Sequence, residues 1–294
     1  MDCAYFGRDS DSHSGGHGAI AGGMTDISPS LGRAVADLMR QVSEDVILPR
    51  YQNLASHEVM EKAADDLVTV ADRESEERLS EGLAKLLPEA SIIGEEACAA
   101  DPALLDGLEA GLYWIIDPID GTGNFAAGRP PFGVMIALAN DGDTLGGWIY
   151  DPLSGRLCHA ARGMGAHIGE EPVTAVESGA PLPIAGISTL FLDPAQRADL
   201  TGRAEGKLQM VDIPRCAAEQ YPRLVLGEND VSIFERTLPW DHAAGVLFLN
   251  EAGGRAARPD GSAYRVDDYA RPGMIGAATP ALWDELAERL AGIG

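Results

Sequence analysis

The sequence of 294 residues has few cysteines, few basic residues and no long apolar run, and each shortage excludes a class of protein. Its four cysteines, Cys3, Cys98, Cys158 and Cys216, form no C-x-x-C pair and no spacing typical of a disulfide framework, which predicts a reducing, cytoplasmic setting. Lys and Arg number 22 against 46 Asp and Glu, and the formal charge of −24 argues against nucleic acid or an anionic membrane as a partner. No stretch approaches the length of a membrane-spanning helix.

Residues 1–25 differ in composition from the rest of the chain. They are rich in Gly, Ser, His and Asp and lack the apolar core of a signal peptide, so we predict a disordered extension. The remaining residues, 26–294, are many for one ordinary domain and few for two independent ones. We therefore predict one large unit with two lobes, at about residues 26–182 and 183–294.

Apolar periodicity predicts the helices and strands of both lobes. Apolar residues at three- and four-residue steps predict an amphipathic helix over residues 31–46, which ends before Pro49. Short apolar runs separated by turn residues predict an antiparallel meander, with strands at 132–138, 145–150, 156–161 and 165–168. Strand-like and helix-like runs then alternate, at 184–188, 194–202, 209–213, 216–226, 231–234, 239–251, 274–277 and 280–290. This order is typical of a layered α/β (α+β) sandwich.

The central feature is an apolar run that ends in two carboxylates. Residues 112–116 have the composition of a short buried strand, and Pro118 cannot donate to a sheet, so we expect Asp117 and Asp120 to lie in a turn. Two carboxylates three residues apart repel each other unless a cation lies between them, and a hard divalent ion is the usual partner of such oxygen ligands. The alternative is an ordinary Asx-rich turn in which Asp120 caps the segment that follows.

Two other apolar segments carry acidic residues at one end. Residues 91–93 form a strand-like run followed by Gly94, Glu95 and Glu96, and we expect Gly94 to let the backbone turn sharply. Residues 239–251 form a helix-like run with Asp241 in the first turn. These acids are candidates for the remaining ligands of the same cation.

Together the three acidic segments resemble a known family. G-E-E at 94–96, D-P-I-D-G-T at 117–122 and W-D-H-A-A-G at 240–245 follow the order found in the inositol monophosphatase family of magnesium-dependent phosphomonoesterases. The resemblance runs from about residue 30 to the C-terminus, so residues 26–294 resemble a phosphatase domain. It implies an αβαβα sandwich, a homodimer, a small phosphorylated metabolite as the substrate and inhibition by lithium.

The resemblance also implies a set of ligands for Mg²⁺, with about two or three ions per site and Mn²⁺ as an alternative. One ion would be held by Glu95, Asp117 and the backbone carbonyl of Ile119. A second ion would be held by Asp117, Asp120 and Asp241. Asp117 would then contact both ions. Without cations, these acids would repel a phosphate substrate. Bound cations would reverse the sign of the local field and allow the phosphate to bind.

The resemblance places Thr122 at the centre of catalysis. Asp72 ends a D-L-V-T-x-x-D run at 66–72 and would orient the hydroxyl of Thr122, which helps to deprotonate the attacking water beside Glu95. The backbone amides of Gly121 and Thr122 would receive phosphate oxygens. From the residues alone, Asp72 is expected to be the N-cap of a helix, and the two roles can coexist.

The positions that would contact the substrate match the family less well. Glu235 lies near a glutamate that meets ring hydroxyls in the inositol enzymes, but it is shifted by one residue, and Arg215, Cys216 and Ala217 replace a Gly-Ser-Ala turn. Cys216 is either a nucleophile or, as is more ordinary, a small buried residue at a helix start. His242 follows the W-D aspartate but points about 100° away from it on a helix. We therefore expect His242 beside the site or at the surface.

These observations predict magnesium-dependent hydrolysis of a phosphate monoester, with inositol monophosphate as the first candidate substrate. Histidinol phosphate, 3′-phosphoadenosine 5′-phosphate and fructose 1,6-bisphosphate stay open, because relatives with the same acids act on each. The alternative from another class is a catalytically silent, metal-dependent regulator with the same fold. The presence of every proposed ligand and of the pair Thr122 and Asp72 favours the enzyme.

Overall fold

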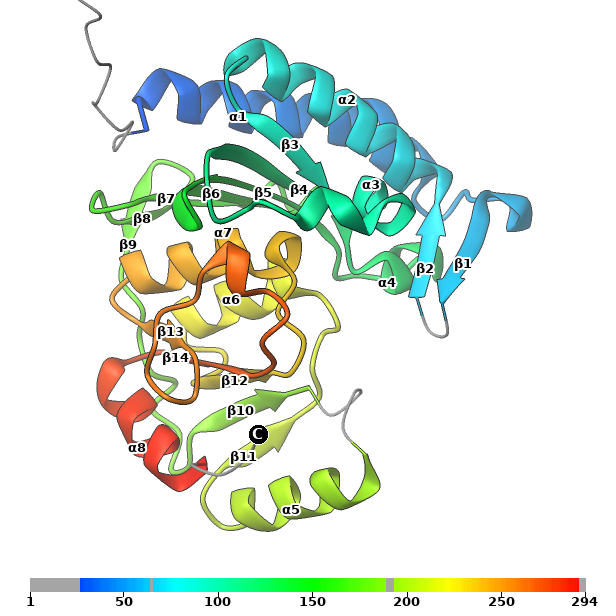
Figure 1. Ribbon diagram of the computed structural model, residues 1–294. Coiled ribbons are helices and arrows are strands. Elements are labelled where there is room, and N and C mark those ends of the chain that lie inside the picture. Colours follow the sequence, from blue (N-terminus) through cyan, green and yellow to red (C-terminus); the bar gives the residue numbers. More distant parts are fainter. Residues whose placement is uncertain (1–26, 64–65, 189–192, 291–294) are drawn as a thin grey trace, which may run out of the picture.

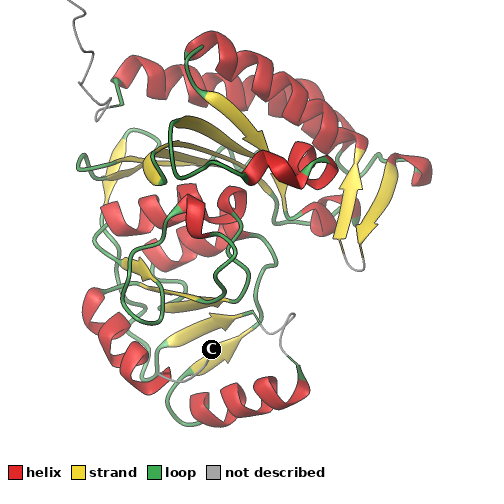
Figure 2. Ribbon diagram, in the orientation of Figure 1, coloured by secondary structure: helices red, strands yellow, loops and turns green. Residues whose placement is uncertain are grey.

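The computed structural model describes residues 27–63, 66–188 and 193–290, and it arranges them in five layers that alternate between helices and sheets (Figure 1). Two sheets lie between three layers of helices, as the colouring by secondary structure shows (Figure 2). The layered α/β sandwich predicted from the sequence is confirmed. The extension predicted for residues 1–25 lies outside the described residues.

The larger sheet has seven strands and positions the first two acidic motifs. Its strands follow the chain in the order β3-β4-β5-β6-β7-β8-β9, and only β3 and β4 are parallel. The predicted meander corresponds to β5 to β8, and β9 is a strand that the sequence did not predict. The strands are β3 (Ser91–Gly94), β4 (Leu112–Asp120), β5 (Gly133–Asn140), β6 (Asp143–Tyr150), β7 (Leu157–Ala161), β8 (Ala166–Ile168) and β9 (Glu171–Val173).

Helices α1 (Pro29–Val42) and α2 (Val70–Leu86) cover the outer face of this sheet (Figure 1). Trp114 and Ile116 of β4 point into the core on that side, while Ile115 points to the opposite core, as the alternation of a strand requires. The α-helix predicted over 31–46 ends earlier than expected, because Ser43–Ile47 form a π turn and Leu48–Arg50 a 3₁₀ turn.

Helices α6 (Ala217–Val225) and α7 (Pro239–Glu251) form the middle layer between the two sheets (Figure 1). Almost every residue of α7 is buried, because the helix has a sheet on either side of it. The contact with β6 is close: a Cβ on Gly147 would lie 2.8 Å from the Cα of Ala244. This packing holds the middle of α7 closely against the larger sheet.

The smaller sheet has five strands in the order β11-β10-β12-β14-β13, with parallel pairs on both sides of β10 and antiparallel pairs on both sides of β14. Helices α5 (Pro194–Ala204) and α8 (Pro280–Leu290) form the last layer (Figure 1). The sequence predicted these elements except β13. The strands are β10 (Ile184–Ile187), β11 (Gln209–Val211), β12 (Val231–Phe234), β13 (Arg255–Ala257) and β14 (Met274–Ala277).

The remaining elements are short. Strands β1 (Val59–Ala63) and β2 (Asp66–Thr69) form a separate antiparallel pair, and α3 (Glu95–Ala100) and α4 (Thr122–Ala126) follow β3 and β4 directly. Three 3₁₀ turns span Ser56–Glu58, Pro102–Leu105 and Val266–Asp268. Within the described ranges, every helix is too short or too polar to cross a membrane.

Candidate metal centre and active site

Strand β4 carries two of the predicted metal ligands, and it is longer than the sequence indicated. We expected Pro118 to end the strand and to place Asp117 and Asp120 in a turn, but this was wrong: β4 continues to Asp120, which pairs with Gly133 of β5. The register shifts between Asp117 and Asp120, so Pro118 lies in a bulge, where a residue without an N–H group interrupts no regular pairing. The bulge re-aims the two carboxylates, and α4 begins directly after them.

Asp117 and Asp120 meet Asp241, which comes from the first turn of α7. One oxygen atom from each of the three carboxylates lies within 4.8 Å of the other two. Asp117 is 1% exposed, and the side chain of Asp241 is 19% exposed. Three converging carboxylates are a donor set that fits a hard divalent cation such as Mg²⁺ or Mn²⁺.

The electrostatics of the three carboxylates also fit a cation. Burial is the largest cause that raises the pKa of Asp117 well above its ordinary value, and the charge of Glu95 adds to it. Burial and then Glu95 raise the pKa of Asp241 to about 8. Burial raises the pKa of Asp120 to about 6, although the backbone N–H of Ala218 stabilises its charged form. A bound divalent ion would supply the positive charge that this cluster lacks.

Glu95 and Ile119 lie beside the three aspartates. Glu95 is the first residue of α3, is half-buried and lines the same cavity. Ile119 lies in the β4 bulge, and its N–H donates to Asp117 Oδ1 at 3.1 Å. The five residues that the sequence predicted as metal ligands therefore line one cavity, and three of them converge in the aspartate cluster.

Thr122 and Asp72 are in contact at the edge of the cavity. Thr122 Oγ1 lies 3.2 Å from Asp72 Oδ1 and 2.9 Å from the carbonyl oxygen of Ile119. The N-cap of α2 is Thr69 and not Asp72, which corrects the expectation from the residues alone. Asp72 instead accepts bonds from the N–H and the hydroxyl of Thr69 through Oδ2, which leaves Oδ1 for Thr122. Burial is the main reason that the pKa of Asp72 is raised to about 7.

Gly121 joins β4 to α4 in a left-handed conformation, with φ +83°. A Cβ at this position would lie 3.0 Å from the carbonyl oxygen of Pro131 and 3.2 Å from Cys216 Cβ. Both the backbone conformation and the lack of space therefore require glycine here. Gly121 and Thr122 both line the cavity.

The cavity has a volume of about 810 Å³. All residues that the sequence predicted for the site line it except Asp72, which lies behind Thr122. Arg215 is exposed and has φ +54°, a conformation that costs energy for a residue with a side chain. Ala217 is the first residue of α6 and Glu235 directly follows β12, and both contribute to the cavity wall.

Cys216 is the N-cap of α6, is buried and directs its Sγ to the carbonyl oxygen of Asp120 at 3.7 Å. Burial raises the pKa of this thiol well above its ordinary value, so the reactive thiolate is disfavoured. Its position corresponds to the small buried residue at a helix start that we expected as the alternative to a nucleophile.

His242 is buried and does not lie at the surface, which removes one of its two expected positions. Its Nε2 lies 3.0 Å from the carbonyl oxygen of Arg236, which only accepts, so Nε2 carries the proton. Its Nδ1 then accepts from the hydroxyl of Tyr221 at 2.8 Å. Burial lowers the pKa of His242 to about 3, which keeps the ring neutral.

Sequence reasoning missed several residues of the cavity. Arg129 and Arg236 line it together with Arg215, and the Nη2 atom of Arg236 lies 3.8 Å from Asp241 Oδ2. Asn124 is buried and donates to the carbonyl oxygens of Pro131 and Pro214, which ties α4 to the segment before Arg215. A signal for two of them was present in the sequence: basic residues are few in this chain, yet Arg129 and Arg236 lie within a few residues of an acidic motif.

The sequence matches the model of the inositol monophosphatase family over residues 32–293. The chain is 32% identical over 254 residues to Nus factor SuhB of Haemophilus influenzae, which covers 84% of this chain and 90% of that protein. It is 33% identical to inositol-1-monophosphatase of Mycobacterium leprae, over 76% of this chain and 78% of the relative.

Solved structures share the fold. The extragenic suppressor protein suhB from Bartonella henselae superposes with a TM-score of 0.74 at 23% identity, over 90% of this chain and 99% of that one. An IMPase from Thermotoga maritima also has a TM-score of 0.74, at 25% identity, over 90% of this chain and 98% of that one. With three ordered acidic motifs converging on one cavity, and a family match that spans nearly the whole described chain, this protein belongs to the inositol monophosphatase family.

Proposed function

We propose that the protein is a magnesium-dependent phosphomonoesterase that acts on a small metabolite, with inositol monophosphate as the first candidate. The observation that carries this proposal is the convergence of Asp117, Asp120 and Asp241 beside Thr122 and Asp72. The first three residues form a cation site, and the other two form a route for a proton. Hydrolysis of a phosphate ester requires both.

The residues that would hold the metal are Glu95, Asp117 and the carbonyl of Ile119 for one ion, and Asp117, Asp120 and Asp241 for another. When bound, Mg²⁺ supplies positive charge for the phosphoryl oxygens and activates water. The backbone N–H of Ala218 donates to Asp120 Oδ2 at 2.5 Å, which holds this carboxylate in place from the start of α6.

Thr122 and Asp72 are proposed to orient the attacking water and to take its proton. The hydroxyl of Thr122 can donate to Asp72 Oδ1 while its lone pair accepts from a water molecule in the cavity. Asp72 is suited to receive the proton because its pKa is raised to about 7, close to neutral pH. Its Oδ2 atom is held by Thr69, so the orientation of Oδ1 is fixed.

The arginines are proposed to contact the anionic parts of the substrate, and Glu235 its hydroxyl groups. Arg129, Arg215 and Arg236 are exposed and line a cavity that is otherwise rich in carboxylates. Guanidinium groups bind phosphate and carboxylate through two donors at once. A substrate with a second anionic group, such as fructose 1,6-bisphosphate or 3′-phosphoadenosine 5′-phosphate, would gain most from them.

The names of relatives support a phosphatase with an open substrate range. They include inositol-1-monophosphatase of Bacillus subtilis and fructose-1,6-bisphosphatase/inositol-1-monophosphatase of Aquifex aeolicus. Other relatives are named Nus factor SuhB, which keeps a regulator of the same fold as the alternative. In this chain the proposed ligands and the pair Thr122 and Asp72 are intact, which favours the enzyme.

The test is phosphate release from inositol monophosphate, histidinol phosphate, 3′-phosphoadenosine 5′-phosphate and fructose 1,6-bisphosphate, each with Mg²⁺, with Mn²⁺ and with excess chelator. We expect release that depends on metal for at least one ester, and a rank order that identifies the substrate class. Lack of release from all four esters by a protein that still binds Mg²⁺ in calorimetry would instead favour the regulator.

A further inference from the structure

A carboxylate from helix α2 caps helix α3, where the proposed ligand Glu95 lies. Glu76 is 8% exposed, and its Oε2 and Oε1 atoms accept the backbone N–H groups of Glu96 and Ala97, each at 2.8 Å. These are the second and third residues of α3, whose N–H groups have no acceptor within their own helix. The N-cap residue is Gly94, which has no side chain to supply one.

The glycine of the G-E-E motif leaves room for this carboxylate in its capping position. Gly94 has φ −112° and ψ 151°, ordinary extended angles that any residue adopts, so the sharp turn that we expected does not explain it. A Cβ on Gly94 would come within 3.0 Å of all three atoms of the Glu76 carboxylate. A larger residue at position 94 would therefore push Glu76 away from the two N–H groups that it accepts.

One face of helix α2 thus contacts two segments that line the cavity, one through Asp72 and the other through Glu76. Asp72 and Glu76 are four residues apart, so their side chains lie on the same side of the helix. Asp72 contacts Thr122, and Glu76 accepts the backbone N–H of Glu96, the residue directly after Glu95. A shift of α3 relative to α2 would therefore change the position of Glu95 relative to Asp117.

We propose that Glu76 is a positioning residue, which holds Glu95 at the metal centre by capping α3. The proposal rests on the proposed function only in taking Glu95 as a metal ligand. Loss of a group that orients a metal ligand typically costs about 10- to 100-fold in metal affinity.

The first test measures Mg²⁺ or Mn²⁺ binding by calorimetry, without substrate, for Glu76→Gln and Glu76→Ala. We expect the Kd to rise by about 10-fold or more. The matched control is Asp230→Asn, because Asp230 is also a buried carboxylate and accepts the N–H groups of Ser178 and Ile184 at 2.6 and 2.7 Å, but does not line the cavity. It should lower the thermal midpoint and leave the Kd unchanged.

The second test is a double-mutant cycle between Gly94→Ala and Glu76→Ala. Alone, Gly94→Ala should raise the Kd for the metal, because the new methyl group displaces the Glu76 carboxylate. Added to Glu76→Ala, it should cost little more, because the overlapping group is gone. This cycle also keeps the proposal testable if one Glu76 variant folds poorly, since Gly94→Ala retains the carboxylate.

Turnover provides a third readout. In the Glu76 variants, the Mg²⁺ concentration for half-maximal activity should rise, while kcat at saturating Mg²⁺ recovers, because Glu95 is still present. The proposal is overturned if the Glu76 variants have a lower thermal midpoint but bind metal like the wild type. It is also overturned if the effects in the double-mutant cycle are additive. Either result would show that the cap is purely structural. If wild type binds metal, the variants bind it weakly and no ester is hydrolysed, the proposed function fails and the positioning role stands.

Discussion

Asp117 occupies the most demanding position among the acids of the cavity. It is almost fully buried, four other carboxylates raise its pKa, and it is the one side chain proposed to contact both ions. All three aspartates also interact with a group outside the cluster: Asp117 accepts from Ile119, Asp120 accepts from Ala218, and Asp241 lies 3.8 Å from Arg236. A substitution at Asp117 therefore tests the metal centre most directly.

We expect Asp117→Asn to lower kcat/KM by about 10³ or more, because one change removes a charge from both proposed ion sites. Glu96→Gln is the comparison, since Glu96 follows the proposed ligand Glu95 on α3 but is not itself a proposed ligand. It should change kcat/KM by less than about tenfold. Steady-state kinetics over a range of Mg²⁺ concentrations would check both. Equal losses in the two variants, or activity in excess chelator, would contradict the assignment.

Thr122→Ala should lower turnover by about 10² or more while the Kd for Mg²⁺ changes little, because the hydroxyl is proposed to handle a proton and not to bind metal. Thr122→Ser keeps a hydroxyl that can reach Asp72 and should retain most of the activity. Turnover and calorimetric metal binding are measured on the same preparations. If metal affinity falls in step with turnover, Thr122 has been given the wrong role.

Binding of Mg²⁺ should release protons, because the metal-free carboxylates hold them. The pKa of Asp241 is raised to about 8 and that of Asp120 to about 6, so at pH 7 Asp241 is mainly protonated and must lose about one proton to bind a cation. Metal affinity should therefore rise with pH between about 6 and 8. The raised pKa values of Asp120 and Asp241 also make the stability of the metal-free protein depend on pH. Stability should fall as the pH rises from the ordinary carboxylate pKa of about 4 to the raised values, because the folded protein favours the protonated carboxylates. Bound Mg²⁺ should offset that loss.

Calorimetry of Mg²⁺ binding in two buffers with different ionisation enthalpies counts the released protons. Asp241→Asn should reduce the number released at pH 7. A metal affinity that is independent of pH, with identical heats in both buffers, would mean that the carboxylates are already ionised in the metal-free protein.

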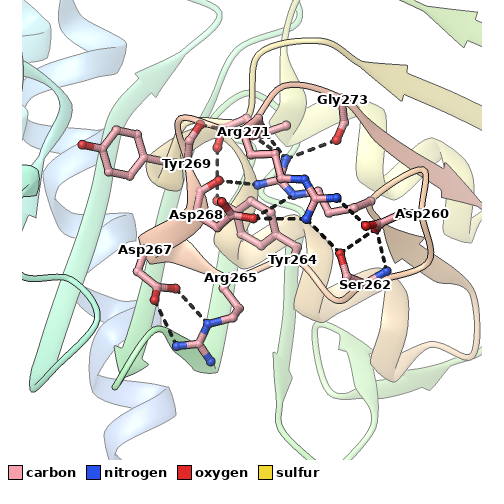
Figure 3. Close-up of polar contacts among 11 residues, drawn as sticks. Asp260, Ser262, Tyr264, Arg265, Asp267, Asp268, Tyr269, Arg271 and Gly273 are labelled. Atoms are coloured by element: carbon pink, nitrogen blue, oxygen red, sulfur yellow. Dashed lines mark hydrogen bonds and ion pairs between the residues drawn. The ribbon is translucent and has the colours of Figure 1, made fainter. Parts of the chain in front are cut away.

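At the scale of elements, the loop that follows β13 holds the start of α7 through a buried arginine. Arg258 is 0% exposed, and its guanidinium donates to Thr237 Oγ1 at 2.8 Å and to the carbonyl oxygens of Arg271, Gly273 and Asp268 at 2.8, 3.1 and 2.6 Å. Figure 3 shows this loop, in which Arg271 also bonds Asp260 and Ser262 at its outer side.

Thr237 links this loop to the active site. It lies in the segment between β12 and α7, which carries Glu235 and leads to Asp241. The N–H of Gly273 also donates to the carbonyl oxygen of Glu235 at 2.9 Å. The positions of Glu235 and of the first turn of α7 therefore depend on contacts made by residues 258–273.

Arg258→Met should lower the free energy of unfolding by about 2–4 kcal/mol, because the part-buried carbonyl oxygens of Asp268 and Gly273 lose the donor that Arg258 supplies. Arg271→Met is the control, since its side chain is partly exposed and its partner Asp260 lies at the surface. It should cost much less. Urea denaturation measures both, and an equal loss in the two variants would show that burial of Arg258 has no special importance.

At the scale of the whole molecule, the described residues of the predicted lobes 26–182 and 183–294 share an apolar cluster, and each lobe also has a cluster of its own. The apolar cluster around α6 and α7 includes Ile115 and Met135 from the larger sheet and Phe234 and Met274 from the smaller one. Neither sheet can bury its inner face without this middle layer. We therefore propose that the two lobes fold as one cooperative unit.

Unfolding should accordingly occur in a single transition. Trp114 lies in the core of the larger sheet, and Trp283 of α8 lies in the core beside the smaller sheet; both are buried. Of the four tryptophans, one single-tryptophan variant should retain only Trp114 and another only Trp283, so that each reports on one lobe. Their fluorescence midpoints in urea should coincide with each other and with circular dichroism. Two separated midpoints would show lobes that unfold independently.

The chain order and the local patterns of this sequence determined the layered fold and the identity of the acids. Alternating and helical periodicity depends on neighbours a few residues away, which explains why the meander of β5 to β8 and the helix α7 could be predicted to within a few residues. The acids of the three motifs lie in the last residues of a strand, directly after a strand or in the first turn of a helix, and they meet where these element ends come together. The family resemblance then supplied the roles of Asp117, Asp120 and Asp241.

Only the tertiary structure decided how those acids are held, because the contacts involved join segments far apart in the chain. Asp120 stays in a strand since β5 pairs with it across the bulge, and Pro118 by itself indicated the opposite. Gly94 by itself indicated a turn, whereas in the fold the carboxylate of Glu76 fills the space where its side chain would be. Periodicity reports which face of an element is buried, whereas the partner on that face follows from how the layers pack.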